Sequence, residues 1–240
     1  MCTLSFVPTG GNDFVLTCNR DESLARATAL PPQKQIVQHL EVLFPIDPKG
    51  KGTWIANSAN GFSLCLLNGG FVKHKNNPPY RKSRGLVLLD FFQFNNVNQF
   101  VVNYNFNRIE PFTMVIVEYK SSLKLYELVW DGKQAHLSVK DQKLPQIWSS
   151  TALYPTHKKK ERELWFETWK IENSENLNAE TIKNFHITGG GDDSENKLVM
   201  RRSEVSTVSI TQIIRTLASV EMSYQDMLKK TQSSATMDLA

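Results

Sequence analysis

The sequence predicts an α+β fold, because short apolar runs typical of paired strands outnumber the segments with helical spacing. The strongest hairpin signal is Asn60-Gly61, which lies between the apolar runs 53–58 and 62–68. Three further strand-like runs lie within 112–139 and are separated by turn residues. Helical spacing is confined to a few segments, at about 84–94, 97–103 and 157–170. Hairpins with helices set apart from them indicate an α+β architecture rather than a doubly wound sheet.

Length and composition describe one globular domain. The chain has 240 residues, of which 40% are hydrophobic and 10% aromatic, enough to form a core without disulfides. Its net charge of +4 comes from local clusters and does not by itself indicate nucleic-acid binding. No apolar run approaches the roughly 18 residues of a membrane span, and no signal segment opens the chain. We therefore expect a cytoplasmic protein with one domain over 1–228 and a disordered Ser/Thr-rich tail over 229–240.

The first 22 residues are the most informative part of the chain. Two strand-like runs, 2–7 and 14–19, flank a loop rich in Pro and Gly, which predicts a hairpin. If the last residue of the first run pairs with the first residue of the second, Cys2 lies opposite Asn19. Asp21 then lies on the same face as Cys2 and diagonal to it, within reach of its side chain. The hairpin thus brings a cluster of polar residues back to the start of the chain.

Cys2 combines a nucleophile and a base if Met1 is removed, and Cys is small enough for the enzyme that removes the initiator Met. The free α-amine, with an ordinary pKa of about 7.7–8.0, is a general base near neutral pH. The thiol needs such a base to become the reactive thiolate. Cys18 and Cys65 instead lie within apolar runs and are expected in the core. Three cysteines without a CxxC pair predict neither a zinc site nor a disulfide framework.

Two further polar residues lie at the ends of predicted elements. Asn68 is expected to end a strand opposite Thr53, before the flexible pair Gly69-Gly70. There it can present hydrogen-bond donors to an oxyanion, or it can simply form the turn. Arg84 lies near the start of the helix expected over 84–94, where it can meet an acidic substrate group or remain solvated.

The connecting segments carry weaker signals. Residues 23–52 are rich in Pro and Gly, and we expect an irregular surface segment that borders the pocket. Residues 205–210 predict a strand. The spacing over 211–226 fits both a helix and a strand, and we favour the strand.

Four motifs together resemble the NRDE family, also known as the transport and Golgi organisation protein 2 family. That family is in turn similar to N-terminal nucleophile hydrolases of the penicillin V acylase and bile salt hydrolase type. The resemblance covers about residues 1–225 and implies a four-layer αββα fold. Two stacked antiparallel sheets would lie between helical layers, with Cys2 at the edge of one sheet. The motifs are Met1-Cys2-Thr3, Asn19-Arg20-Asp21-Glu22, Gly52-Thr53-Trp54-Ile55-Ala56 and Leu66-Leu67-Asn68-Gly69-Gly70.

The resemblance also implies roles for the candidate residues. Cys2 would attack a carbonyl carbon while its own α-amine carries the proton, and Asp21 would orient that amine. Arg20 and Asn19 would shape the surroundings of the amine. Asn68 would help to stabilise the tetrahedral oxyanion.

Two positions depart from the pattern of related proteins. Many family members have Ser-Asn where this chain has Ser150-Thr151, and an Asn in this region of the related acylases helps to hold the oxyanion. Thr151 can donate only one hydrogen bond, and we keep it as a candidate substrate-binding residue. Bile salt hydrolases carry Arg where Cys18 precedes Asn19 here.

Two functions are compatible with these features. The first is a cysteine amidohydrolase or acyltransferase acting on a small-molecule, non-peptide amide or acyl substrate, without a metal or cofactor. The second is a non-enzymatic carrier or organiser that binds a lipid-like or haem-like ligand and is linked to the secretory pathway. The residues around Cys2 favour the enzyme, whereas the family name favours the carrier. The substrate and the oligomeric state remain open.

Overall fold

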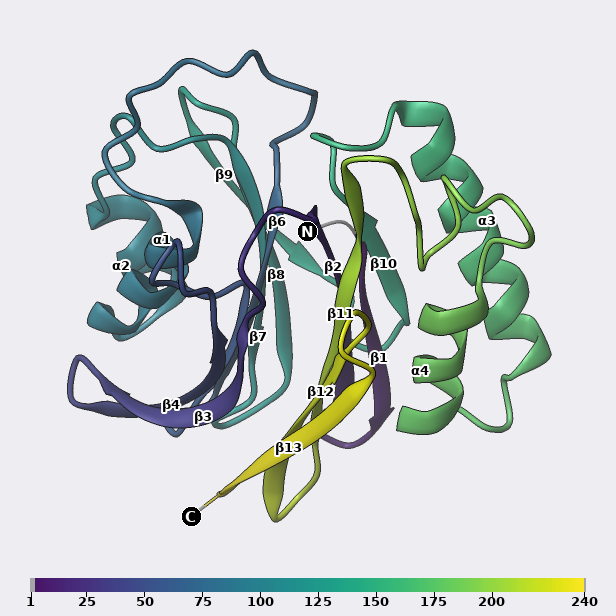
Figure 1. Ribbon diagram of the computed structural model, residues 1–240. Helices are drawn as coiled ribbons and strands as arrows, with labels where there is room; N and C mark the ends of the chain where they lie inside the picture. The colour runs from purple at the N-terminus through teal and green to yellow at the C-terminus, as the bar shows by residue number, and fades with distance from the viewer. Residues whose placement is uncertain (1–2, 240) are drawn as a thin grey trace.

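The structure, a computed structural model, describes residues 3–239; Met1, Cys2 and Ala240 lie outside this range. Two antiparallel sheets lie face to face, and helices cover the outer face of each sheet (Figure 1). The first sheet has the strand order β10-β1-β2-β11-β12-β13, and the second runs in sequence order from β3 to β9. This is the four-layer αββα arrangement that the resemblance implies.

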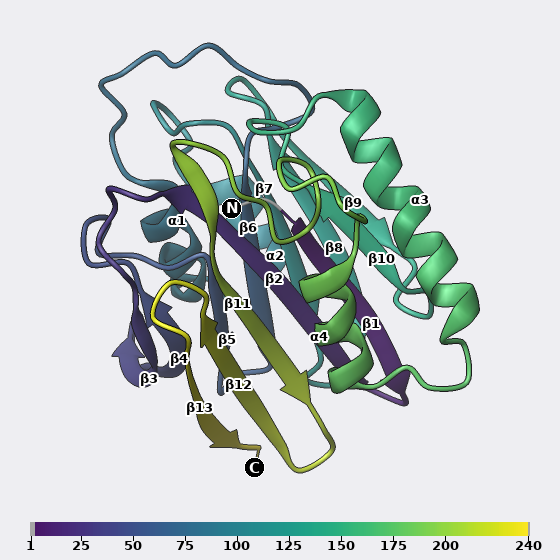
Figure 2. The same cartoon turned by 45° about the vertical axis from the view of Figure 1, so that its right-hand side comes forward.

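The first sheet combines strands from both ends of the chain, so that the N-terminal hairpin lies at its centre beside β11. Figure 2 shows α3 and α4 in front of this sheet. The strands of this sheet are β1 (Thr3–Gly10), β2 (Asp13–Ser23), β10 (Gln146–Ser149), β11 (Val205–Arg215), β12 (Ser219–Asp226) and β13 (Thr231–Asp238).

The second sheet is a meander in which each strand pairs with the next along the chain. Its strands are β3 (Leu30–Val37), β4 (Leu40–Ile46), β5 (Ile55–Ser58), β6 (Phe62–Asn68), β7 (Phe112–Glu118), β8 (Lys124–Trp130) and β9 (Ala135–Lys140). The helices are α1 (Arg84–Asp90), which a 3-10 turn extends over Phe91–Gln93, α2 (Val97–Asn103), α3 (Thr156–Glu172) and α4 (Ala179–Thr188). None of the helices within 3–239 is long and apolar enough to cross a membrane.

Alternation along β1 separates two cores. Leu4 and Phe6 point into the main core, which includes the space between the sheets. Val7 points the other way, into a smaller core beneath the helices, where it joins Phe166 of α3 and Phe185 of α4. Burying each of these side chains stabilises the fold by about 1.5–3 kcal/mol. The two faces of β1 therefore fix both sheet-to-sheet and sheet-to-helix packing.

The register of the N-terminal hairpin differs from the prediction by one residue. Thr3, not Cys2, lies opposite Asn19, and the strands pair almost to the tip of the hairpin. A bulge between Pro8 and Gly10, with Gly10 at φ 119°, accommodates the extra residue. The composition of the loop indicates a turn but does not locate the bulge, so the predicted register was wrong.

The second predicted hairpin is shifted in the same way. Ser58, not Ala59, lies opposite Phe62, so Thr53 does not face Asn68. The connection is a three-residue loop that ends at Gly61, whose φ of 89° suits glycine. A three-residue loop explains the shift of one position.

Two segments expected to be irregular form strands. Within 23–52, β3 and β4 form a hairpin, and β3 tolerates Pro31 and Pro32 because it is an edge strand with a register shift there. The predicted disordered tail from Lys229 instead forms β13, which pairs with β12 along its length and buries Met237. The Ser/Thr composition of this segment suits a half-exposed edge strand as well as a disordered tail.

Two short elements were not predicted. β10 pairs with β1 through Thr3 and Ser149, so β1 is not at the edge of its sheet as the resemblance implied. Four residues are too few for a recognisable alternation. The helix α4 follows a polar stretch, and its capping box at Asn178 is its clearest local signal.

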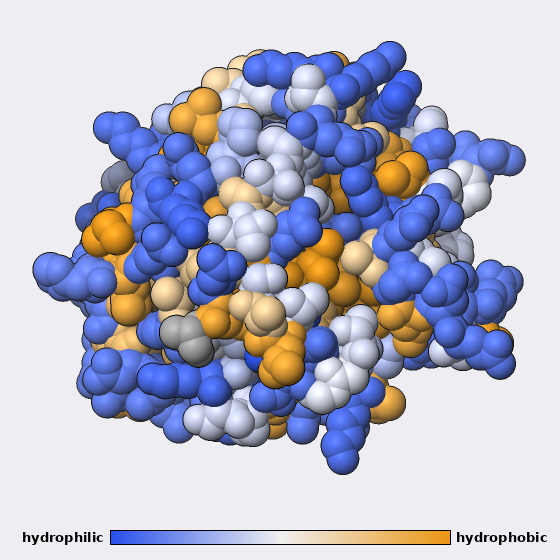
Figure 3. Space-filling model, turned by 90° about the horizontal axis from the view of Figure 1, so that it is seen from below, coloured by the Kyte–Doolittle hydropathy of each residue, from blue (hydrophilic) through white to orange (hydrophobic). Residues whose placement is uncertain are grey.

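The lower end of the molecule has a mixed surface. Hydrophobic side chains form several separate groups among hydrophilic ones on this face (Figure 3). Scattered apolar residues of this kind are ordinary on protein surfaces and need no partner.

Candidate active site

The predicted site residues on β2 point to opposite faces of the first sheet. Asn19 and Asp21 face the helical layer, and Arg20 faces the second sheet, where it lies over the ring of Trp54. Cys2 lies outside the described residues, and Thr3 is the nearest residue that the structure describes. The site is therefore built from the neighbours of Thr3.

Asp21 is buried, with only 2% of its surface exposed. The hydroxyl group of Thr207 donates to Oδ1 at 2.5 Å, and that of Tyr154 donates to Oδ2 at 3.0 Å. Both partners come from distant parts of the chain, so Asp21 is not simply a cap of the local turn. A buried carboxylate needs such donors, because desolvation otherwise disfavours its charge.

Asn19 joins the sheet to the helical layer. Its Nδ2 group donates to the carbonyl oxygens of His186 and Leu198, at 3.0 and 2.8 Å. Its Oδ1 lies 2.5 Å from Nδ1 of His186. Every polar atom of this amide is therefore engaged inside the protein, where it holds the segments that surround the start of β1.

His186 is fully buried and neutral. Its Nε2 lies 2.7 Å from Oγ of Ser5, and since Asn19 Oδ1 is an acceptor, Nδ1 must carry the proton. Burial lowers the pKa of His186 to about 3, with a further contribution from the charge of Arg162. The Ser5–His186–Asn19 order is that of a nucleophilic triad, but all three residues have 0% exposure, so no substrate reaches them.

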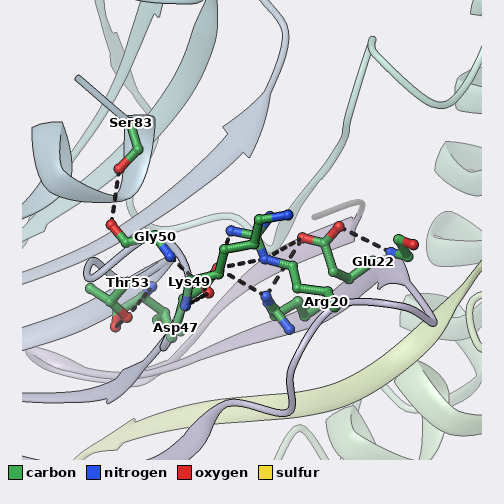
Figure 4. A network of polar contacts seen from close by, with 10 residues as sticks. Arg20, Glu22, Asp47, Lys49, Gly50, Thr53 and Ser83 are labelled. Atoms are coloured by element: carbon green, nitrogen blue, oxygen red, sulfur yellow. Dashed lines mark hydrogen bonds and ion pairs between the residues drawn. The ribbon is translucent and has the colours of Figure 1, made fainter. Parts of the chain in front are cut away.

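On the other face, Arg20 belongs to a network of charges (Figure 4). Its Nη2 lies 3.2 Å from Asp47 and 3.5 Å from Glu22, and Arg26 also contacts Asp47, at 2.7 Å. Burial raises the pKa of Asp47, but the hydrogen bonds from Arg26 and Gly50 and the nearby arginine charges outweigh it and lower the pKa. Arg20 is thus held rigidly by carboxylates.

This network lines a small cavity of about 250 Å³, which we call the polar pocket. It brings together three of the predicted site residues, Arg20, Asn68 and Arg84. The pocket is lined by Arg20, Glu22, Arg26, Asp47, Gly50, Gly52, Thr53, Trp54, Leu66, Asn68, Ser83, Arg84, Gly85 and Glu110.

Asn68 ends β6, as predicted, but faces Phe112 of β7. Its carbonyl oxygen accepts hydrogen bonds from Oγ of Ser150 at 2.6 Å and from the N–H group of Ala152 at 3.4 Å. The segment at 150–152 therefore fixes the backbone of Asn68 at the wall of the polar pocket.

Thr151 is not part of the polar pocket. Its hydroxyl group donates to the carbonyl oxygen of Gly70 at 2.9 Å. A Cβ atom at Gly69, where φ is 93°, would lie 2.2 Å from Oγ1 of Thr151, so this contact requires glycine. Thr151 thus fixes the turn after Asn68.

Arg84 begins α1 and is already paired. Its Nη2 lies 3.1 Å from Glu110, and its Nη1 donates to the carbonyl oxygen of Pro111 at 3.3 Å. Burial lowers the pKa of Arg84 despite the charge of Glu110. The predicted contact with an acidic substrate group therefore has to compete with Glu110.

A second cavity, which we call the groove, has a volume of about 790 Å³. Leu67 and Val129 of the second sheet form one wall, and Trp148 of β10 forms another. Lys159 and Leu164 contribute from α3. The groove is thus larger than the polar pocket, and part of its wall is apolar.

Three residues that the sequence analysis did not single out surround Asp21 and Thr3. Tyr154 and Thr207 bind the carboxylate, and Arg162 donates to Oγ1 of Thr3. Arg162 shares the inward stripe of α3 with Phe166 and Trp169, and that spacing was the available signal. Tyr154 and Thr207 have no local signal, since only tertiary packing brings them to Asp21.

Within 3–239, no group of three or more His, Cys, Asp or Glu side chains is arranged to hold a metal ion. The cysteines at 18 and 65 are free thiols in the core, and burial raises the pKa of Cys65, with a contribution from Cys18.

Three solved structures with a similar fold are a bile acid hydrolase in two variants and an acid amidase. A variant of conjugated bile acid hydrolase from Clostridium perfringens matches with a TM-score of 0.62 at 11% identity, covering 98% of this chain and 92% of that chain. The N-acylethanolamine-hydrolyzing acid amidase ortholog of Caenorhabditis elegans matches with a TM-score of 0.60 at 9% identity, covering 89% and 92%. A second mutant of the bile acid hydrolase matches with a TM-score of 0.54 at 12% identity, covering 100% and 97%.

These similarities show that the chain shares the αββα fold of these proteins. The chain belongs to the Transport and Golgi organisation 2 family, whose model matches residues 1–234. The resemblance drawn from the sequence motifs is thereby confirmed. No curated protein gives a significant match.

The buried His186 predicts a pH dependence of stability. Its folded pKa of about 3 lies below the ordinary value of 6.5, so below pH 6.5 the unfolded chain binds a proton that the folded chain excludes. Above pH 6.5, His186 does not change the free energy of unfolding. As the pH falls from 6.5 toward 3, the free energy of unfolding decreases by up to about 1.4 kcal/mol per pH unit. Urea unfolding between pH 7.5 and 5 measures the slope. In His186→Gln, which cannot titrate, this part of the slope should vanish; an unchanged slope would contradict the assignment.

Proposed function

We propose that the protein is an N-terminal nucleophile enzyme, a cysteine amidohydrolase or acyltransferase acting on a non-peptide amide. The observation that carries the proposal is the buried carboxylate of Asp21. It lies two residues along β2 from Asn19, which pairs with Thr3, the residue next to Cys2. A buried carboxylate at this place can accept a hydrogen bond from an amine at the start of the chain.

The corrected register changes the proposed division of roles. Leu4 and Phe6 face the space between the sheets, the side on which Arg20 also lies. If the alternation of β1 extends to residue 2, the proposed position of the Cys2 thiol is on this side. Asp21 faces the helical layer. Its proposed partner is therefore the α-amine of Cys2 rather than the thiol. The Cα atoms of Cys2 and Thr3 are about 3.8 Å apart, which keeps the amine near this end of β2.

The proposed reaction needs no group from outside the protein. The amine accepts the thiol proton as sulfur attacks the amide carbonyl, and Asn68 stabilises the resulting oxyanion. The amine then gives the proton to the leaving nitrogen, which departs and leaves a thioester on Cys2. Water or an acceptor amine attacks the thioester and restores the thiol. Asp21 keeps the amine directed at sulfur throughout.

The two cavities suggest which amides fit. Leu66 and Asn68 line the polar pocket, and Leu67 and Gly70 line the groove, so the end of β6 separates the cavities. A substrate with a compact polar part and a larger, partly apolar part would place its amide at that point. Hydrolysis of N-acylethanolamines by a protein of the same fold supports an amide as substrate.

A non-enzymatic carrier remains the second candidate, and the groove favours it. About 790 Å³ with an apolar wall can hold a lipid-like ligand without any chemistry at Cys2. Ligand binding that is unchanged in Cys2→Ala, together with an unreactive Cys2, would favour this function.

Acylation of the wild-type protein by p-nitrophenyl acetate tests the enzyme. We expect an intact mass without Met1, a burst of p-nitrophenol and an acetyl group on residue 2. Cys2→Ala should abolish the burst. Cys65→Ala is the matched control and should keep it, since Cys65 is fully buried. Active material that retains Met1, or equal labelling at residues 2, 18 and 65, would contradict the mechanism.

Replacing Asp21 separates a catalytic role from a stabilising one. Asp21→Asn keeps the shape but loses the charge that orients the amine, so acylation should slow by about 10²–10⁴-fold, the usual contribution of acid–base groups. Asp226→Asn is the control, because Asp226 accepts from the N–H groups of Leu228 and Lys229 in a turn. It should lower the melting temperature without slowing acylation. Full activity in a folded Asp21→Asn variant would exclude the proposed role.

A further inference from the structure

Arg162 of α3 is a fully buried cation that contacts the first residue of β1. Its Nη1 donates to Oγ1 of Thr3, and its Nη2 donates to the carbonyl oxygens of Asn196 and Lys197, at 2.8 and 2.9 Å. No carboxylate within 3–239 forms a salt bridge with it, and its Nε has no hydrogen-bond partner among these residues. Burying a charge without a counter-charge destabilises the fold. We therefore look for a role of Arg162 other than packing.

The same guanidinium stacks on the ring of Tyr154, 3.7 Å from the ring centroid. The hydroxyl group of Tyr154 donates to Asp21. Arg162 therefore contacts both Thr3, next to the proposed nucleophile, and the phenol that holds the proposed orienting carboxylate. It joins these groups from α3, and its own side chain lines neither cavity.

We propose that Arg162 is a positioning residue for the N-terminal nucleophile, acting through Thr3 and through Tyr154. The inference rests on the proposed function. In the proposed mechanism Cys2 acts with a free α-amine, and the contact of its neighbour Thr3 with Arg162 would help to hold it in place. Arg162 touches neither the substrate nor the reacting atoms.

Losing Arg162 would let Thr3 and Tyr154 shift, and with them the groups that they hold. Without the guanidinium, the hydroxyl group of Thr3 loses its donor and the ring of Tyr154 loses its stacking partner. A displacement of about 1 Å between reacting groups can slow a reaction by about 10²-fold. Neither loss alters the lining of the polar pocket or the groove, to which Arg162 and Tyr154 do not belong.

The test uses the full chain and p-nitrophenyl acetate, with the acylation rate measured over a range of ester concentrations. Arg162→Met should lower the maximal acylation rate by about 10–10²-fold while half-saturation stays unchanged. Arg162→Lys, which keeps the charge but not the planar stack, should recover part of the rate. Tyr154→Phe keeps the stacked ring but loses the hydrogen bond to Asp21, so it should also slow acylation. Its effect should be less than additive with that of Arg162→Met, because part of the effect of Arg162 passes through Tyr154.

Arg202→Met is the matched control. Arg202 lies 5.5 Å from the centroid of the Tyr154 ring and donates to other groups, the carbonyl oxygen of Glu195 and the side chain of Asn196. Its acylation rate should stay within about twofold of the wild type.

The outcomes separate the inference from the proposed function. A wild-type protein that is not acylated at Cys2 refutes both. Normal wild-type acylation with unchanged maximal rates in folded Arg162→Met and Tyr154→Phe overturns only the positioning role, even if both variants melt earlier. If Arg162→Met does not fold, Arg162→Lys and Tyr154→Phe decide, and normal rates in both overturn the inference.

Discussion

The buried carboxylate of Asp21 constrains the site more than any other group. At 2% exposure it must receive hydrogen bonds or lose its charge. One donor, Thr207, lies on β11 at a point where the pairing with β2 shifts by one residue. A second donor, Tyr154, lies on the segment that leads from β10 into α3. Satisfying one charge therefore fixes β11, β2 and the start of the helical layer relative to one another.

The alternation of β2 distributes the polar residues between two environments. On the helical side, Asn19 and Asp21 are enclosed by protein, which suits orientation rather than contact with a ligand. On the other side, Arg20 and its carboxylate partners line an open polar pocket. Asn68 reaches the same pocket from the second sheet. A nucleophile at the start of β1 would have Asp21 on one side to orient it and the polar pocket on the other side to bind a substrate. The proposed chemistry needs this arrangement.

The sequence predicted the fold class and most strands, because the two-residue period of a strand is a local property. It did not predict the registers, since composition does not show the bulge near Gly10 or the length of the loop before Phe62. It named Asp21 but not its partners. Tyr154 and Arg162 approach from segments more than a hundred residues away, and no local pattern records that approach. The placement of Cys2 stays a prediction.

An experimental structure of the mature protein tests the central claim most directly. The quantity to measure is the distance between the α-nitrogen of Cys2 and the nearer carboxylate oxygen of Asp21. The account predicts a chain that begins at Cys2, with this distance at roughly 2.6–3.2 Å, and the thiol on the side of Arg20. A chain that retains Met1, or an α-nitrogen directed away from Asp21 in catalytically active protein, would contradict it.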